Sequence, residues 1–373
     1  MKKIYIVLPN VGVSGAEKRF FNIWYNLQKD YPIYLIINYK SIIEIISQLK
    51  IDKSIYDNKK IIFFESKKEG LINQIIAIYM INKKIEKKSI IHFPIVYLPV
   101  LSLLRSSKFI VSWVAPYKPN NFKIIKIKFF FITIFSFLFS SKIDILNHNN
   151  YFYLSKNSIL KNKLSLTIGG SFANPEIYRP KKKISQIVFS GRLVPEKGIL
   201  EFINCMIPLK KILLKNNIQL PKIIILGRGH LYEKIQKIIK NNNYNDIDIE
   251  VLFTNEPYKY FAISRIFISL QRYSNYPSQS LIEAMLCGCV PIITNSPDSE
   301  KMISNELGFF IDNKIDYHQL INAIMKILNY SDNDFFEISS KIREYTIKKF
   351  TMNNQIDYFK NLYWNKDYFS KIK

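Results

Sequence analysis

Two basic side chains, Arg192 and Lys197, lie close together in the segment SGRLVPEKG, residues 190–198. The segment follows an apolar run over residues 186–190 that is typical of a β-strand, and a helical pattern comes after it. A guanidinium and an ammonium on one such connection suit a diphosphate, because they bind its charge and stabilise the charge that builds as it leaves. The alternative is a solvated turn whose basic residues are incidental in a lysine-rich chain.

A second segment, residues 269–294, contains groups that suit the rest of a nucleotide. A predicted strand over 266–270 leads through a Ser/Asn/Pro loop into a helix over 278–287, and a glycine turn then leads into a strand over 290–294. In this order the helix begins at the carboxyl edge of a parallel sheet, where its free N–H groups and its dipole attract anions. Glu283, in the same helix, would accept hydrogen bonds from a ribose whose phosphates lie at the helix start.

Short apolar runs alternate with helical stretches along the whole chain, which predicts βαβ units and parallel sheets. The predicted strands of the first half span residues 4–8, 33–37, 61–64, 90–93, 109–114, 143–147 and 164–168. Those of the second half span residues 186–190, 222–226, 249–253, 266–270, 290–294 and 308–311. Between the halves, residues 169–180 are rich in small and turn-forming residues and are the best linker candidate. We therefore predict an α/β protein with two Rossmann-like domains that face each other across a cleft.

Both motifs resemble those of the family 4 glycosyltransferases, which have the GT-B type of fold. Residues 190–198 are similar to the family's G-R-L-x-x-x-K-G segment, and residues 283–291 (EAMLCGCVP) to its E-A-M-x-x-G-x-P. Residues 226–230 (LGRGH) are similar to its G-x-G-P, and the tail over 350–363 to its last helices. The resemblance extends over nearly all of the chain and is more specific in the second half.

The resemblance implies an N-terminal acceptor-binding domain over residues 1–172 and a nucleotide-sugar donor domain over residues 173–350. A last helix, within residues 351–373, would cross back to the first domain. The implied reaction is retaining: the nucleoside diphosphate leaves on the side that the acceptor attacks, and its β-phosphate deprotonates the incoming hydroxyl. Arg192 and Lys197 take the role that a metal ion has in other transferases, so we expect neither a metal nor another cofactor.

Three groups of site residues follow from the motifs and the resemblance. The predicted catalytic residues are Arg192, Lys197, Glu283 and His92. The predicted donor-binding residues are Gly191, Gly227, Gly229, Asn275, Ser278, Gln279 and Ser280. A loop predicted to contact a phosphate or the acceptor contains Gly12, Ser14 and Gly15. Glycines there let a ligand approach the backbone closely, although an ordinary strand-to-helix turn has the same composition.

Two of these predictions have alternatives. His92 ends a predicted strand and is placed to reach the cleft, but a histidine beside Phe93 is also typical of a core residue whose ring nitrogens are hydrogen-bonded. The family pairs the Glu283 position with an earlier acidic residue, and at the corresponding place this chain has Asn275 and Ser274. Neutral polar residues there keep hydrogen bonding to the transferred sugar and lose charge, so the motif leaves the donor sugar open.

The composition favours an anionic partner. The chain has 54 Lys and Arg against 29 Asp and Glu, a net charge of +25. Lysines are spread throughout, and no RNP-like, zinc-finger or helix-turn-helix signature accompanies them, so nucleic acid is not an expected partner. Residues 129–139 (FFFITIFSFLF) follow several lysines and are too short to span a bilayer. They form either a buried helix or an aromatic wedge in the membrane interface, which suits a lipid-linked acceptor.

We therefore expect a metal-independent retaining glycosyltransferase in surface-polysaccharide synthesis, of the lipopolysaccharide or capsule type. It would move a sugar from a nucleoside-diphosphate donor to a glycan or lipid-linked glycan, in the cytoplasm and against the anionic inner face of the cell membrane. One alternative is a non-catalytic glycan-binding or assembly partner, which the missing acid favours and the retained Arg192, Lys197 and Glu283 disfavour. The other is a nucleotide-sugar 2-epimerase, which needs more acidic and histidine residues in its cleft.

Overall fold

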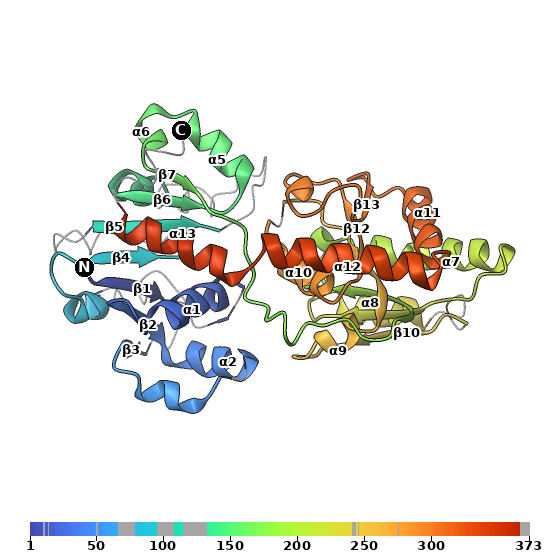
Figure 1. Cartoon of the computed structure of the whole chain (residues 1–373), viewed down its shortest axis with the longest axis horizontal. Coiled ribbons are helices and arrows are strands. Elements are labelled where there is room, and N and C mark those ends of the chain that lie inside the picture. The colour runs from blue at the N-terminus through green and yellow to red at the C-terminus, as the bar shows by residue number, and fades with distance from the viewer. Residues whose placement is uncertain are drawn as a thin grey trace. The chain divides into compact units, whose positions relative to one another are not determined.

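The chain folds into two compact units with separate cores (Figure 1). One unit contains Met1–Phe172 together with Met352–Lys373, and the other contains Ala173–Thr351. The computed structural model describes residues 1–9, 12–13, 15–49, 51–65, 79–94, 108–114, 133–240, 244, 246–274 and 276–365.

The first unit is built on a seven-stranded parallel sheet with the order β3-β2-β1-β4-β5-β6-β7. Its strands are β1 (Ile4–Leu8), β2 (Ile33–Asn38), β3 (Ile61–Phe64), β4 (Ile90–Phe93), β5 (Lys108–Trp113), β6 (Lys142–Ile145) and β7 (Leu164–Leu166). All five residues of β1 and all four of β4 are buried, as expected for parallel strands that helices cover on both faces.

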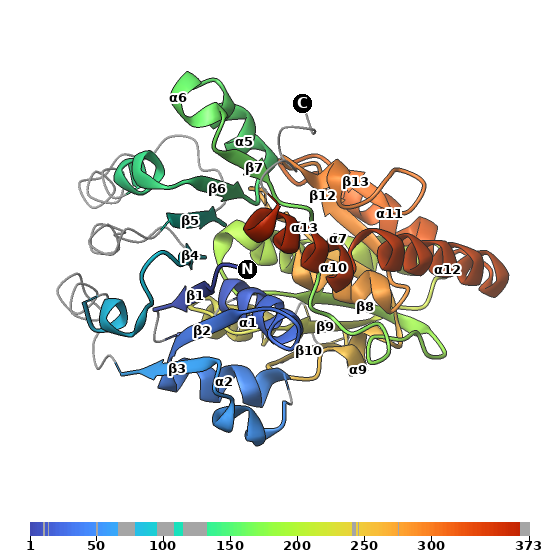
Figure 2. The ribbon, with the colours of Figure 1, turned by 60° about the vertical axis from the view of Figure 1, so that its left-hand side comes forward.

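Two helices far apart in the sequence cover one face of this sheet. The helices among the described residues of the unit are α1 (Gly15–Leu27), α2 (Tyr39–Leu49), η1 (Lys53–Asp57), α5 (His148–Ser155), α6 (Ser158–Lys161) and α13 (Met352–Trp364), and residues 79–84 and 133–139 are also helical. α13 packs on α1 (Figure 2), where Phe20 of α1 and Phe359 of α13 meet edge to face at 5.6 Å between ring centroids. α13, the last helix among the described residues, is thus part of the first unit.

A buried polar network fixes α13 to the sheet. Asp144 of β6 is 1 % exposed and accepts hydrogen bonds from Ser112 of β5 (2.6 Å), from Thr167 and from Tyr358 of α13 (2.5 Å). The Tyr358 hydroxyl also lies 3.0 Å from Ser165 Oγ. Three hydroxyl donors on one buried carboxylate compensate its desolvation, and burial beside Asp144 raises the pKa of Tyr358 well above its ordinary value.

We predict that Tyr358→Phe destabilises the first unit by about 1–2 kcal/mol, because it leaves a buried carboxylate with one donor fewer. Urea unfolding followed by tryptophan fluorescence measures this unit alone, since all three tryptophans (Trp24, Trp113 and Trp364) lie in it. Tyr79→Phe is the matched control, because Tyr79 is 55 % exposed. Equal midpoints for the two variants would show that the Asp144 network does not hold α13.

The second unit contains a six-stranded parallel sheet with the order β10-β9-β8-β11-β12-β13. The strands are β8 (Ile184–Ser190), β9 (Lys222–Leu226), β10 (Ile249–Leu252), β11 (Ser264–Ser269), β12 (Val290–Thr294) and β13 (Phe309–Ile311). The helices are η3 (Pro195–Lys197), α7 (Ile199–Lys215), α8 (Tyr232–Ile239), α9 (Tyr258–Phe261), α10 (Gln279–Leu286), η5 (Ser299–Lys301), α11 (Tyr317–Leu328) and α12 (Asp332–Lys349). The prediction of two Rossmann-like α/β domains is confirmed.

The strand order of each sheet reverses at one point. In the second unit the chain proceeds from β8 through β9 to β10 in one direction, and from β11 through β12 to β13 in the other. The connections that leave β8 and β11 therefore diverge at the carboxyl edge, and such switch points are where open α/β sheets bind ligands. The corresponding point in the first unit lies between β1 and β4.

Candidate functional site

The connection after β8 carries the two predicted basic residues, Arg192 and Lys197. Its path depends on Gly198, which has a φ of 68° and lies so close to β11 that a Cβ would be 2.4 Å from the carbonyl oxygen of Leu270. Only glycine fits a left-handed backbone with a neighbour at that distance. The connection is therefore held against the end of β11, on the other side of the switch point.

Lys197 crosses the switch point with its side chain. Its Nζ donates a 2.7 Å hydrogen bond to Oε1 of Gln271, which follows β11. Burial, and then the nearby charge of Arg192, lower the pKa of Lys197 to about 8. Arg192 itself is exposed. Two cations so placed repel each other, and a diphosphate would relieve that repulsion.

Gly227 and Gly229, predicted to bind the donor, pack against the loop that contains Arg192. A Cβ on Gly227 would lie 2.0 Å from the carbonyl oxygen of Gly191, and one on Gly229 would lie 2.4 Å from that of Leu193. Hydrogen bonds of 3.0 Å from Gly191 N to Leu226 O and from Leu193 N to Arg228 O join the two loops. In this structure the two glycines thus let the loops after β8 and β9 meet, and donor contact stays a prediction.

The start of α10 lies after β11, at the same edge of the sheet. Ser278 is the N-cap residue and is 4 % exposed, yet its Oγ has no hydrogen-bond partner among the described residues. Gln279 and Ser280 begin the helix. A buried hydroxyl without a partner is costly, and it lies beside free helix N–H groups that attract anions. Asn275, also predicted for this site, lies outside the described residues.

Ser274, at the place where the sequence motif lacks an acidic residue, is hydrogen-bonded to a carboxylate from another connection. Its Oγ donates a 2.7 Å hydrogen bond to Oδ2 of Asp298, which precedes η5 in the connection after β12. Ser274 is 3 % exposed, and Asp298 has a φ of 69°. A carboxylate from another connection is therefore present beside the Ser274 position.

Glu283 lies one turn into α10 and is held by two side chains. Gln279 Nε2 donates to its Oε1 at 3.0 Å, and the hydroxyl of Tyr178 also hydrogen-bonds its carboxylate. Burial, followed by the charge of Glu283, raises the pKa of Tyr178 well above its ordinary value. Tyr178 belongs to the predicted linker, and nothing in the local sequence indicated its role.

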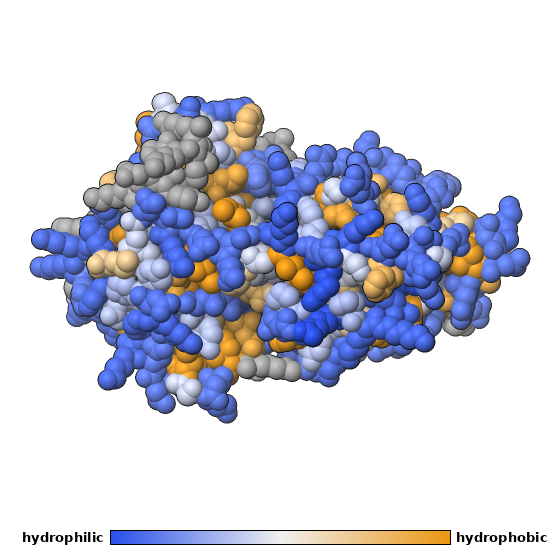
Figure 3. Space-filling model, viewed as in Figure 1, coloured by the Kyte–Doolittle hydropathy of each residue, from blue (hydrophilic) through white to orange (hydrophobic). Residues whose placement is uncertain are grey.

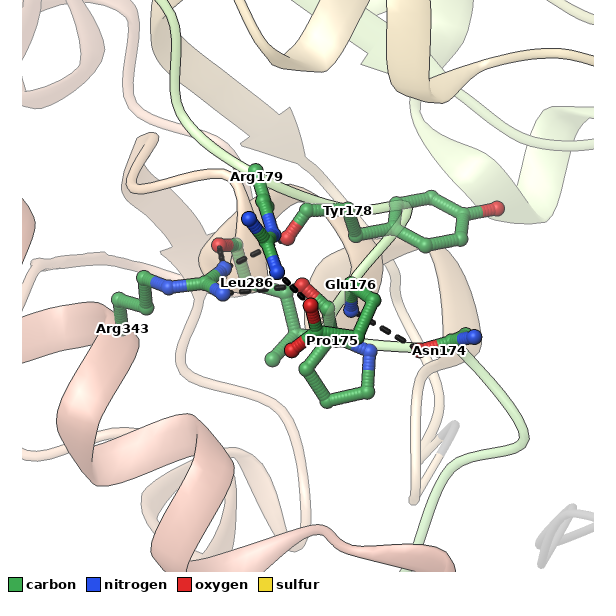
Figure 4. A network of polar contacts seen from close by, with 7 residues as sticks. All are labelled: Asn174, Pro175, Glu176, Tyr178, Arg179, Leu286 and Arg343. Atoms are coloured by element: carbon green, nitrogen blue, oxygen red, sulfur yellow. Dashed lines mark hydrogen bonds and ion pairs between the residues drawn. The ribbon is translucent and has the colours of Figure 1, made fainter.

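Arg343 of α12 holds the main chain around Tyr178 in place (Figure 4). Its guanidinium donates to the carbonyl oxygens of Tyr178 (2.6 Å), Pro175 (2.9 Å) and Leu286, the last residue of α10. The Tyr178 ring points away from the guanidinium (Figure 4) and meets the Tyr258 ring edge to face at 6.0 Å between centroids. Arg343 thus ties residues 175–178 to the end of the helix that carries Glu283.

His92 lies within the first sheet rather than at its edge. It pairs in register with Ile6 of β1, two residues before that strand ends, and is 0 % exposed. Its Nδ1 lies 2.6 Å from the Tyr363 hydroxyl and its Nε2 lies 2.8 Å from Ser112 Oγ. Burial, and then the charge of Arg19, lower the pKa of His92 to about 3, so the ring is neutral. This geometry fits the structural interpretation and gives the predicted catalytic role no support.

The predicted loop after β1 is described in part. Gly15 begins α1, and a Cβ on either Gly12 or Gly15 would meet no atom of the described residues within 4 Å. Among the described residues, no close neighbour requires a glycine at either position. Ser14 lies outside the described residues.

The apolar run over residues 129–139 is described from residue 133 onward, where it is helical. Phe137 is buried and packs on Trp113 at 5.4 Å between ring centroids. Four other side chains are exposed: Ile134, Phe135, Leu138 and Phe139. One face of this helix is thus core and another is apolar surface, which we call the apolar patch. No helix among the described residues is long and apolar enough to cross a bilayer.

The two Rossmann-like units define the GT-B type of fold, and comparison with solved structures agrees. The chain superposes on Anabaena HepE, crystallised with UDP and glucose, with a TM-score of 0.77 at 12% identity over 97% of this chain and 99% of that one. It superposes on a mutant of Staphylococcus aureus TarM, crystallised with fondaparinux, alpha-GlcNAc-glycerol and UDP, with a TM-score of 0.73 at 16% identity over 98% and 100%. At such identities the likeness establishes a shared fold.

Sequence comparison shows that the second unit is similar to a known family. Residues 171–349, which include the whole candidate site of the second unit, match the family model of glycosyl transferases group 1. A stretch of 193 residues is 26% identical to poly(ribitol-phosphate) alpha-N-acetylglucosaminyltransferase of S. aureus, over 51% of this chain and 36% of that protein.

A second curated relative is a lipid-linked glycan transferase by name. A stretch of 93 residues is 28% identical to the N-acetylgalactosamine-N,N'-diacetylbacillosaminyl-diphospho-undecaprenol 4-alpha-N-acetylgalactosaminyltransferase of Campylobacter jejuni, over 24% of this chain and 25% of that protein. The chain thus covers about a third and a quarter of the lengths of the two relatives. The match supports the resemblance to group 1 glycosyltransferases over residues 171–349, and membership of family 4 stays a prediction.

We predict that Gly198→Ala lowers the stability of the second unit by about 1–3 kcal/mol, since it adds a Cβ to a left-handed residue with no space for it. Calorimetric unfolding of the full chain measures the effect. Gly191→Ala is the control in the same connection, because its Cβ would meet no described atom closer than Lys197 Cδ at 4.0 Å. If both variants unfolded at the wild-type temperature, Gly198 would not be what holds the connection against β11.

Proposed function

We propose that the protein is a retaining glycosyltransferase that moves a sugar from a nucleoside-diphosphate donor to a glycan or lipid-linked glycan acceptor in surface-polysaccharide synthesis. One observation carries the proposal: Arg192, Lys197 and the start of α10 lie at the carboxyl edge beside the switch point between β8 and β11. Cations and a helix N-terminus around such a point form a site for a diphosphate. The match to group 1 glycosyl transferases over the same residues, and the names of the two relatives, support the reaction and the acceptor class.

In the proposed mechanism the protein acts mainly by placing charge. Arg192 and Lys197 bind the diphosphate and stabilise its growing charge as the glycosidic bond to it breaks. The N–H groups at the start of α10, with Ser278, bind the same oxygens, and Glu283 accepts hydrogen bonds from the ribose. The β-phosphate removes the proton of the acceptor hydroxyl on the face from which it leaves, so that configuration is retained. Because side chains supply the positive charge, we propose that no metal ion is needed.

Asp298 is proposed to take the place of the acidic residue that precedes the Glu283 position in relatives. Its carboxylate lies 2.7 Å from the hydroxyl of Ser274 and offers acceptors for sugar hydroxyls. The site then retains hydrogen bonding to the transferred sugar, which favours an active transferase over a non-catalytic glycan-binding protein.

We predict that Arg192→Ala or Lys197→Ala lowers the turnover number by two or more orders of magnitude and leaves the unfolding temperature unchanged, because each removes a preorganised charge. Release of the nucleoside diphosphate from a donor sugar, with a lipid-linked or glycan acceptor, measures turnover. Lys211→Ala in α7 is the control, since Lys211 is exposed on a helix. Near-normal turnover of either site variant would contradict the diphosphate assignment.

An anionic membrane surface is the second proposed partner. The apolar patch comes from the first unit, and Lys163 lies beside it, since its Nζ donates a 2.7 Å hydrogen bond to the carbonyl oxygen of Leu138. Apolar side chains with nearby cations suit the interface of an anionic leaflet, where a lipid-linked acceptor would be found. Figure 3 shows that hydrophilic side chains cover most of the face drawn there.

We predict that the protein sediments with vesicles that contain anionic phospholipid and less with purely zwitterionic ones, and that the double variant Phe135→Ser/Phe139→Ser weakens sedimentation severalfold. Both side chains lose their apolar contact with the acyl region. Phe336→Ser is the control, since Phe336 is 72 % exposed on α12 of the other unit. Equal sedimentation of the two mutants would rule out the apolar patch as the membrane contact.

A further inference from the structure

The residue that holds the Lys197 side chain is Gln271, which the sequence motifs do not single out. Its Oε1 accepts the 2.7 Å hydrogen bond from Lys197 Nζ, and its Nε2 lies 3.4 Å from Ser269 Oγ. With the amide nitrogen turned toward Ser269, the oxygen faces the lysine. This orientation of the Gln271 amide presents its oxygen, a hydrogen-bond acceptor, to the Lys197 ammonium.

The main chain at Gln271 is held from both sides of the switch point. Thr294, the last residue of β12, donates from its hydroxyl to the Gln271 carbonyl oxygen at 2.5 Å. The next residue, Arg272, donates its N–H to the carbonyl oxygen of Glu196 in η3 at 3.2 Å. The side chain of Gln271 thus starts from a fixed backbone, and a fixed backbone limits where Lys197 is held.

Gln271 is a neutral hydrogen-bond acceptor, so Lys197 keeps its positive charge for an anionic ligand. Gln271 orients the Lys197 ammonium without cancelling its charge, whereas a carboxylate at the same position would form an ion pair and compete with the ligand. The charged groups that act on Lys197 are Arg192, which disfavours its protonation, and Glu196 of the same turn, which favours it. A diphosphate adds negative charge and favours the protonated lysine further.

We propose that Gln271 is a positioning residue of the donor site, which holds the Lys197 ammonium at the switch point and leaves its charge available for the diphosphate of the donor. The inference rests on the proposed function. In this role Gln271 affects diphosphate binding only by positioning Lys197. It also means that donor binding takes up a proton where Lys197 is partly neutral in the free protein.

The test is calorimetric titration of the full chain with UDP, without metal, between pH 7 and pH 9. Gln271→Ala is expected to weaken UDP binding several-fold and Gln271→Glu about tenfold or more, because the carboxylate neutralises Lys197. Gln319→Ala is the control and should bind as the wild type does, since Gln319 pairs with Asp312 beside α11. In a Lys197→Ala background, Gln271→Ala should have no further effect.

Proton uptake separates positioning from a general structural role. With the pKa of free Lys197 at about 8, UDP affinity should be highest below pH 8 and should fall as the pH rises above it. Titrations at pH 8 in buffers of different ionisation enthalpy should show proton uptake by the wild type and none by Lys197→Arg, whose guanidinium stays charged.

The possible results distinguish a failure of the role of Gln271 from a failure of the proposed function. Three results would overturn the role of Gln271: wild-type-like binding by Gln271→Glu, an equal effect of Gln271→Ala with and without Lys197, or binding that does not depend on pH. In each of these cases the binding of UDP would still support the proposed function. If the wild type bound none of UDP, GDP, ADP and CMP, the proposed function would fall, and the role of Gln271 with it.

Discussion

The meeting of two connections at the switch point of the second sheet determines the rest of the candidate site. The turn after β8 lies against the end of β11 because Gly198 has no side chain, and the Lys197–Gln271 hydrogen bond joins the two connections beyond that contact. Gly227 and Gly229 bring the loop after β9 to the same place. Backbone proximity, rather than any one charged residue, thus positions Arg192, Lys197 and the start of α10. A change that separated these connections would remove the site while leaving every charged residue in the sequence.

The sequence predicted those parts of the fold that depend on local pattern. The strand predicted over 290–294 is β12 without change, and the helix predicted over 278–287 is α10 less one residue at each end. Apolar runs between turn residues fix such elements locally. Where a side chain caps the next element, prediction was less accurate: the strand expected over 143–147 ends at Ile145, because Asn147 caps α5 by accepting a hydrogen bond from Asn150 N.

The parts that the sequence could not predict depend on contacts between distant residues. Gln271 and Tyr178 hold the predicted Lys197 and Glu283, yet neither lies in a recognised motif, since their roles arise only when β8, β11 and the linker are placed together. Asp298 reaches Ser274 from a separate connection. His92 shows the opposite case, in which a chemically capable residue at the end of an apolar run belongs to a buried network with Ser112 and Tyr363. Residue type and strand position alone do not distinguish these outcomes.

The central claim is that the second unit binds a nucleoside diphosphate through side-chain cations. A thermal-unfolding panel with UDP, GDP, ADP and CMP, each with and without EDTA, tests it most directly. The account predicts that one nucleoside diphosphate raises the unfolding temperature equally with and without EDTA, with about 2.7 kcal/mol of added stability at a hundred times its dissociation constant. Absence of any shift, or a shift that EDTA abolishes, would contradict it.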